Sequence, residues 1–249
     1  MPLPHYLCGM FRIALPVLLV FTAALTACGP TPDEQYQTAR TKVADGQYTE
    51  AISLLNEVLE EQPDRAEAYN LRGVAYLEMD SLSNAISEFT QAIRVTPEDY
   101  RPYFNRANTY RVQQKLPEAL QDYNVVISKE PALTDAYLNR SVVLFEMKNL
   151  KAASKDIKEA LQLAPENKLV LLNAGKIFYT ADSLNLAENS LKKLVNQDNQ
   201  NGEAFYLLGQ VKRKQSNSGE ACTLFKQAIK YGYTKAEALA KLSCASVAE

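Results

Sequence analysis

One spacing constrains this chain more than any other feature: alanine recurs at a constant interval, with no insertion or deletion between neighbours. A large residue follows four positions after each alanine. The alanines are Ala51, Ala85, Ala119, Ala153, Ala187 and Ala221, and the large residues are Leu55, Phe89, Tyr123, Ile157, Leu191 and Phe225. A fixed period of this length is typical of repeat architectures, in which one unit cannot bury its apolar face alone. Stacking of neighbouring units must therefore supply the core.

Three more positions repeat with the same period. Each unit has another large residue, a small residue four positions later and, in most units, a proline. The large residues are Tyr69, Tyr103, Tyr137, Leu171 and Phe205, the small ones Gly73, Ala107, Ser141, Gly175 and Gly209, and the prolines Pro63, Pro97, Pro131 and Pro165. A spacing of four places the large and small residues on one helix face. Proline ends a helix, so it separates one unit from the next.

This pattern resembles the tetratricopeptide repeat, a helix-turn-helix unit of about 34 residues. The resemblance implies an all-α fold, a right-handed α-solenoid of six tandem units over residues 32–233. The edge units depart from the pattern, because Gln35 occupies a large-residue position and Asn199 and Tyr233 replace the proline. Edge units are expected to be atypical, since one side of each faces solvent.

Residues 234–249 are predicted to form a C-terminal capping helix. Gly232 is a natural helix stop, and the residues from Thr234 to Val247 have an amphipathic pattern. Ala238, Leu239 and Leu242 are expected on its apolar side.

Residues 1–27 have the pattern of an export signal, with Arg12 before an uncharged apolar stretch from Ile13 to Ala27. That stretch is shorter than the roughly 20 residues of a transmembrane helix. The start codon corresponds to Met1 or to Met10. The run Leu25-Thr26-Ala27-Cys28 resembles the bacterial lipobox, which implies a diacylglycerol thioether on Cys28 and cleavage before it. The alternative is ordinary cleavage near Ala27 and an unmodified Cys28.

The lipobox resemblance implies a lipoprotein of the bacterial cell envelope, held at a membrane by its acyl chains. Residues 28–32 would be a short lipidated tether, so the folded part should sit close to the bilayer. Gly29 is not the aspartate that retains lipoproteins at the inner membrane in some bacteria. This favours delivery to the outer membrane, facing the periplasm.

Arginine recurs on the first helix of three units, and an acid follows each arginine at the same sequence separation. The pairs are Arg72 with Glu88, Arg106 with Asp122, and Arg140 with Asp156. Where the arginine is missing, at Ala174 and Leu208, the acid is missing too. We expect structural salt bridges that align the two helices of a unit, each worth about 0 to 1 kcal/mol if exposed.

Two cysteines lie in the last part of the chain. Cys222 precedes the turn at Gly232, and Cys244 follows it at a similar separation. Two antiparallel helices would place them level, and an even pair in an exported chain favours a disulfide. The arrangement also resembles the terminal repeats of other exported tetratricopeptide proteins. The alternative is a pair of buried free thiols.

Composition argues against several functions. The only histidine is His5, inside the predicted signal, so the mature chain has none for a catalytic triad. Residues 28–249 contain no glycine-rich phosphate loop and no metal-ligand motif. The 27 basic and 29 acidic residues give a net charge of −2 without long runs, which does not favour nucleic-acid binding. We expect no enzyme, no cofactor, no metal and no small-molecule substrate.

The family resemblance implies that the first helices line a concave groove that accepts a protein partner or an extended peptide. One position in this groove is asparagine in three successive units, and such a row could hold a peptide backbone by donating and accepting hydrogen bonds. The groove residues that we predict are Asn105, Asn139, Asn173, Asn108, Arg111, Lys176, Tyr179 and Arg213, with Phe104, Leu138, Phe145 and Tyr206 as apolar neighbours. The alternative is that the three asparagines only satisfy neighbouring helices or face water.

The sequence thus predicts a membrane-anchored scaffold or adaptor that binds a partner in its groove within an envelope complex. The rival prediction is a structural subunit of an outer-membrane, pilus or cell-wall assembly, which packs through its convex face. The carboxylate clamp of chaperone-binding relatives is not supported, because Asn70, Phe104 and Val74 occupy some of its positions.

Overall fold

The computed structural model describes residues 29–245, and within them the chain is helical, with no strand. The predicted export signal and Cys28 lie outside the described residues. The helices are α1 Pro32–Ala44, α2 Tyr48–Glu61, α3 Ala66–Glu78, α4 Leu82–Val95, α5 Tyr100–Val112, α6 Leu116–Lys129, α7 Thr134–Glu146, α8 Leu150–Leu163, α9 Lys168–Thr180, α10 Leu184–Gln197, α11 Gly202–Lys214, α12 Ser218–Lys230 and α13 Glu237–Ala245, with a short 3₁₀ helix at Thr234–Ala236.

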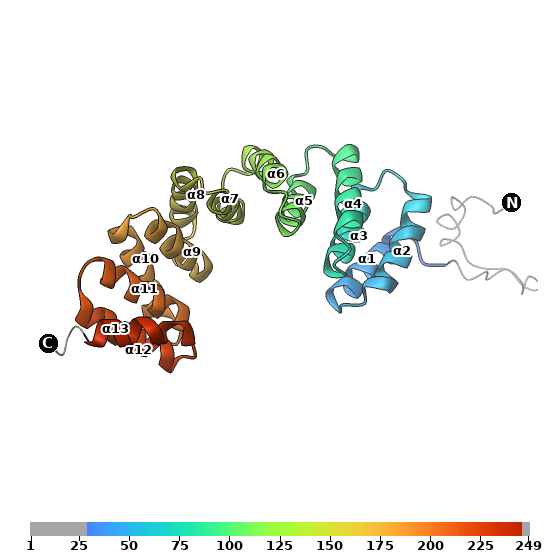
Figure 1. Cartoon of the computed structure of the whole chain (residues 1–249). Helices are drawn as coiled ribbons and strands as arrows, with labels where there is room; N and C mark the ends of the chain where they lie inside the picture. The colour runs from blue at the N-terminus through green and yellow to red at the C-terminus, as the bar shows by residue number, and fades with distance from the viewer. Residues whose placement is uncertain (1–28, 246–249) are drawn as a thin grey trace, which may run out of the picture.

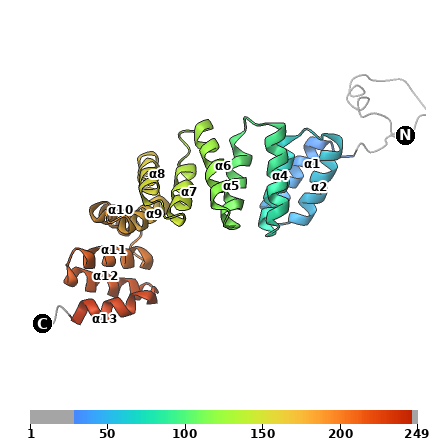
Figure 2. The same cartoon turned by 45° about the horizontal axis from the view of Figure 1, so that its top comes forward.

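Consecutive helices form six antiparallel pairs, from α1 and α2 to α11 and α12, and the pairs stack into a curved solenoid (Figure 1). The all-helical solenoid that the repeat predicts is therefore confirmed. The first helix of each pair lies on the inner side of the curve, most clearly α5, α7 and α9, and the second helix lies on the outer side. First helices of neighbouring pairs also contact one another. Figure 2 shows that the axis of the stack changes direction between the N-terminal and the C-terminal helix pairs.

The two helices of a pair approach closely where a small residue faces a large one. A Cβ atom added at Gly73 would lie 2.6 Å from the Phe89 ring, and at Gly175 it would lie 2.4 Å from Leu191. Such distances are shorter than any van der Waals contact, so in these two pairs a larger residue would force the facing side chain to move. The recurring alanines of the second helices are fully buried beside these contacts.

Local signals fix the ends of the helices. Thr31 and Glu34 form a capping box at the start of α1, and Asn167 caps α9 by accepting hydrogen bonds from the amides of Leu169 and Val170. The prolines of the repeat stand just beyond the last residues of α2, α4, α6 and α8. They end these four second helices as the sequence predicts.

The turn inside each pair depends on one residue in the left-handed region of backbone space. These residues have φ between 57° and 75°, recur at the interval of the repeat, and are Gly46, Asp80, Gln114, Lys148, Asp182 and Ser216. Only the first is glycine, so most of the turns accept the steric cost that a side chain incurs in this conformation.

The last pair is covered by α13, which the disulfide between Cys222 and Cys244 joins to α12, with a Cα–Cα distance of 4.9 Å. The helix begins later than expected, at Glu237, after the 3₁₀ turn. The prediction of its apolar side was wrong in part: Ala238 and Leu242 are exposed, and Leu239 is half-buried. The buried positions are Ala236, Ala240 and Ser243, because the 3₁₀ turn rotates the helix and small residues allow close packing.

None of the helices described between residues 29 and 245 has the length and apolar composition of a membrane-spanning segment. The same residues contain no group of three or more histidine, cysteine or acidic side chains that could hold a metal ion.

The left-handed turns give a prediction about stability. Gln114→Gly should stabilise the protein by roughly 0.5–1 kcal/mol, because glycine adopts positive φ without a steric cost. Its neighbour Gln113 has φ −76°, so Gln113→Gly should lower stability by a similar amount through chain entropy. Urea unfolding of both variants measures this, and a loss of stability in both would contradict the assignment.

Candidate protein-binding face

The predicted groove residues lie on the first helices α5, α7, α9 and α11, which line the inner side of the curve (Figure 1). We call the side chains on this side of α3, α5, α7, α9 and α11 the concave face. One asparagine of the predicted row lies on each of α5, α7 and α9, so the repeat places them in register.

The asparagine row makes hydrogen bonds within the protein. Asn105 Nδ2 donates to Asn70 Oδ1 on the preceding first helix, at 3.0 Å. Asn139 Nδ2 donates to Asn108 Oδ1 in the same way, also at 3.0 Å. Asn173 Nδ2 donates instead to the Leu169 carbonyl of its own helix, at 2.9 Å. The three positions are therefore not equivalent, and in two of them the amide links neighbouring repeats.

Asn108 is the centre of a small polar network. Its Oδ1 accepts hydrogen bonds from Asn139 and from the Tyr123 hydroxyl. Burial raises the pKa of Tyr123 well above its usual range, although Arg111 opposes the shift. The phenol is therefore neutral at physiological pH and remains a donor. Sequence reasoning treated Tyr123 as a core residue, and its hydroxyl also ties α6 to the concave face.

Charged groups of the concave face pair across neighbouring first helices. Arg111 on α5 lies 3.9 Å from Glu146 on α7, and Lys176 on α9 lies 3.0 Å from Glu203 on α11. The Nε of Arg111 and one carboxylate oxygen of Glu146 are buried without a hydrogen-bond partner. The first pair is thus long and incompletely satisfied, whereas the second has good geometry.

Aromatic residues lie among these charges. Lys214 Nζ lies 4.9 Å from the centre of the Tyr179 ring, which is a cation–π distance. Arg213, the residue before Lys214, is exposed. Phe104, Phe145 and Tyr206 are half-buried. Leu138 does not line the face as predicted, because it is 2% exposed and belongs to the core.

Each arginine–acid pair joins a first helix, which carries the concave face, to the second helix of the same unit. The shortest N–O distances are 2.8 Å for Arg72 with Glu88, 2.7 Å for Arg106 with Asp122 and 2.6 Å for Arg140 with Asp156. These pairs are more buried than typical surface salt bridges, which are worth about 0 to 1 kcal/mol. The Asp156 side chain, for example, is only 4% exposed. Loss of one partner in such a pair costs about 3–5 kcal/mol.

Each arginine also reaches the preceding unit. Arg140 Nη1 donates to Asn124 Oδ1 at 2.7 Å, and its guanidinium lies 5.7 Å from the centre of the Tyr137 ring. Arg72 and Arg106 make the corresponding hydrogen bonds to Asn56 and Thr90. The arginine therefore joins three helices, which the sequence comparison within one unit did not predict.

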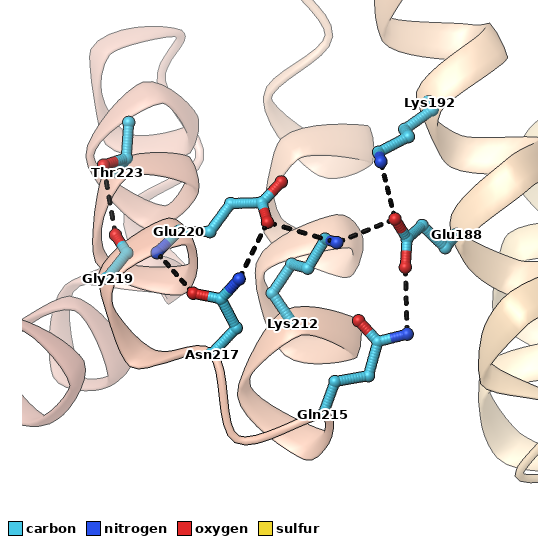
Figure 3. Close-up of polar contacts among 8 residues, drawn as sticks. All are labelled: Glu188, Lys192, Lys212, Gln215, Asn217, Gly219, Glu220 and Thr223. Carbon is cyan, nitrogen blue, oxygen red and sulfur yellow. Dashed lines mark hydrogen bonds and ion pairs between the residues drawn. The ribbon is translucent and has the colours of Figure 1, made fainter.

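A different polar cluster joins the last two units (Figure 3). Lys212 Nζ on α11 lies 2.7 Å from Glu188 on α10 and 3.1 Å from Glu220 on α12, and its side chain is 9% exposed. Glu188 also contacts Lys192 and accepts a hydrogen bond from Gln215. Burial opposes ionisation of Glu188, but hydrogen bonds from Lys192, Lys212 and Gln215 outweigh it and lower its pKa to about 2. No repeated pattern in the sequence indicated this cluster.

Two segments of the chain, residues 42–105 and 134–167, match family models described as tetratricopeptide repeat. These two matched segments are tetratricopeptide repeats. The two matched segments include the whole second and fourth units and parts of the first and third. The helix pairs continue beyond them with the same spacing.

Several solved structures have the same fold as this chain. PilF of Pseudomonas aeruginosa superposes with a TM-score of 0.72 at 18% identity, over 83% of this chain and 96% of that one. PilW, described as a type IV pilus biogenesis factor, gives 0.71 at 16% identity, over 85% and 97%. YrrB, described as a protein with an unusual peptide-binding site, gives 0.65 at 18% identity, over 72% and 92%. Identities this low show the fold alone, and no curated protein matches the chain by sequence.

The polar cluster between the last two units predicts a pH effect. The pKa of Glu188 falls from its ordinary value of 4.5 to about 2 on folding, so its contribution to stability is present above pH 4.5 and is lost as pH falls towards 2. Glu188→Gln should cost about 1–3 kcal/mol at pH 7, because a buried lysine loses a charged partner. Its deficit against the natural protein should shrink between pH 5 and pH 2.

Urea unfolding at several pH values measures this difference, and Glu60→Gln, at an exposed position, is the matched control. A deficit of Glu188→Gln that stays constant over the same pH range would contradict the lowered pKa.

Proposed function

We propose that this protein is a membrane-anchored scaffold that binds an extended segment of a partner protein on its concave face, within a complex of the bacterial cell envelope. The observation that carries the proposal is the continuous row of amide and charged side chains on successive first helices from α3 to α11. A repeated row of this kind matches the repeated donors and acceptors of a peptide backbone.

A bound peptide would replace hydrogen bonds that the asparagine side chains already make with one another, because these side chains are not free in the unbound protein. Asn105 and Asn139 hold their neighbours through neutral side-chain hydrogen bonds, which contribute only about 0.5–1.5 kcal/mol each. A peptide that offers equivalent donors and acceptors can replace them at small cost. The long contact between Arg111 and Glu146, with unsatisfied atoms on both sides, is the best candidate for a group that a ligand would complete.

The known properties of similar folds support the protein-binding part of this proposal. Tetratricopeptide proteins are generally scaffolds without catalytic activity. The YrrB structure is described as having a peptide-binding site, and PilW as a pilus biogenesis factor. By analogy, we assign the concave face here to a protein partner and not to a small-molecule substrate.

The anchoring part of the proposal rests on the lipobox-like sequence that ends at Cys28. Because α1 begins at Pro32, acyl chains on Cys28 would hold the first unit within about 18 Å of the bilayer. Stable anchoring needs two or more acyl chains, which this type of modification supplies. We place the protein at the outer membrane, facing the periplasm, because Gly29 is not an inner-membrane retention signal.

A photo-crosslinking amino acid at the position of Asn173 tests the concave face. Asn173 lies on α9, whereas Asn189 lies exposed on α10, on the outer side of the same pair. In native membranes, a probe at position 173 should capture a defined partner, identified by mass spectrometry, and a probe at 189 should not.

A triple variant completes this experiment. Asn105→Ala, Asn139→Ala and Asn173→Ala together should reduce capture by a probe at position 179 at least about fivefold, equivalent to roughly 1 kcal/mol. Circular dichroism must show that the variant remains folded. Capture from position 189 instead of 173 would favour the rival function, a structural subunit that packs through its convex face.

The anchor has its own test. Cys28→Ser should move the protein from the detergent phase to the aqueous phase on Triton X-114 partition, because the acyl chains supply its membrane affinity. The control converts both Cys222 and Cys244 to serine. This change removes the disulfide but keeps Cys28, so the partition should stay unchanged. Retention of Cys28→Ser in the detergent phase would exclude lipid anchoring at this residue.

A further inference from the structure

A basic cleft lies away from the concave face, between the fourth and fifth units. Its volume is about 630 Å³, within the range of small-molecule sites. One wall is α8, a second helix on the outer side of the curve, and the other is the turn Thr180–Ser183 between α9 and α10. Lysines Lys151, Lys155 and Lys158 line it together with Ser154.

The three lysines form one stripe on α8. Their spacing of four and three positions places them on one face of the helix. All three are exposed, and none lies within ion-pair distance of a carboxylate among residues 29–245. Like charges at this spacing repel by a few tenths of a kcal/mol, so the stripe does not help α8 to fold.

The stripe is not part of the repeat. The positions that correspond to Lys151, Lys155 and Lys158 carry proline, glutamine and asparagine in the third unit, and serine, serine and threonine in the second. In the fifth unit they carry two asparagines and Lys192, which pairs with Glu188. Stacking of units therefore does not require positive charge here.

The opposite wall supplies one hydroxyl donor. Ser183 stands before the first residue of α10, and its side chain makes no capping hydrogen bond. The backbone amides of Ala181, Asp182 and Ser183 donate to carbonyls at the end of α9, so the Ser183 hydroxyl is the donor that this wall can offer a ligand. The acidic residue of the cleft, Asp182, is already engaged by Lys214 Nζ at 2.8 Å. Ser154 Oγ is buried in the α8 wall and has no hydrogen-bond partner.

We propose that this cleft binds a phosphate group, either of a soluble compound or of a lipid headgroup. Three lysine ammonium groups on one wall and the Ser183 hydroxyl on the other form a set that suits a compact oxyanion with more than one charge. A nucleic acid is disfavoured, because one short stripe of lysines offers few phosphate contacts on a chain whose net charge is −2.

The proposal is tested by calorimetric titration of the full-length protein, in neutral detergent at low salt, with inorganic pyrophosphate as the probe. Replacement of Lys151, Lys155 and Lys158 by glutamine should weaken binding at least about tenfold, equivalent to roughly 1.4 kcal/mol. Replacement of Lys226, Lys235 and Lys241 removes the same charge at the C-terminal end and should change binding less than about twofold. Ser183→Ala, which keeps every charge, should weaken binding by about threefold to tenfold.

A second arm separates the two sources of phosphate. Co-sedimentation with vesicles of phosphatidylglycerol is compared with vesicles of phosphatidylcholine alone, using the Cys28→Ser protein so that the anchor does not contribute. Lysine-dependent binding to pyrophosphate without binding to anionic vesicles supports a soluble ligand, and lysine-dependent binding to both supports a lipid headgroup.

Three results would overturn the proposal. These are equal losses in the cleft variant and the charge-matched control, absence of saturable binding to both phosphate probes, and binding of an oligoglutamate peptide in place of them. None of these results bears on the concave face, whose test uses different residues and a different readout.

Discussion

The approach of the two helices within a unit is the contact on which the rest of the molecule depends. Gly73, Gly175 and Gly209 each face a large side chain of the second helix so closely that a Cβ atom would overlap with it. Ala107 and Ser141 occupy the corresponding positions of the third and fourth units, so these pairs also close on a small residue and have nearly the same geometry. Equal pairs stack with an equal step, which produces a regular curve and aligns the first helices on its inner side. The concave face is thus a consequence of how tightly each pair closes.

The sequence predicted the architecture because the repeated residues act through local geometry. A large residue and a small one four positions apart share a helix face, and proline ends a helix in any context. The left-handed turns were not predicted, because Gln114 and Lys148 occupy positions where glycine is the usual signal. The apolar side of α13 was predicted wrongly because a 3₁₀ turn rotated the helix, and such a turn leaves little trace in hydrophobic periodicity.

The candidate face was harder to predict than the fold, for a physical reason. Periodicity places Asn105, Asn139 and Asn173 in register, but each amide can choose between a neighbouring repeat and its own backbone at almost equal energy. Small differences in the surroundings decide this choice, such as Asn70 beside the first and Asn108 beside the second. The partners of a polar side chain therefore depend on several repeats at once, whereas a helix depends on one.

The polar contacts between units also divide the array into two parts. In the second, third and fourth units an arginine joins three helices, and the last of these is Arg140. The fifth unit has Ala174 in its place, and the position that accepts from arginine in earlier units becomes Lys158. A separate cluster around Lys212 then joins the fifth and sixth units.

The boundary between the fourth and fifth units is thus where the repeated polar contact stops. Among the residues that the structure describes, it is also where three lysines without an acidic partner appear. Since packing there rests on buried apolar residues such as Ile157, Val170 and Leu171, polar positions on the outer surface are released from a structural role and are available for a ligand.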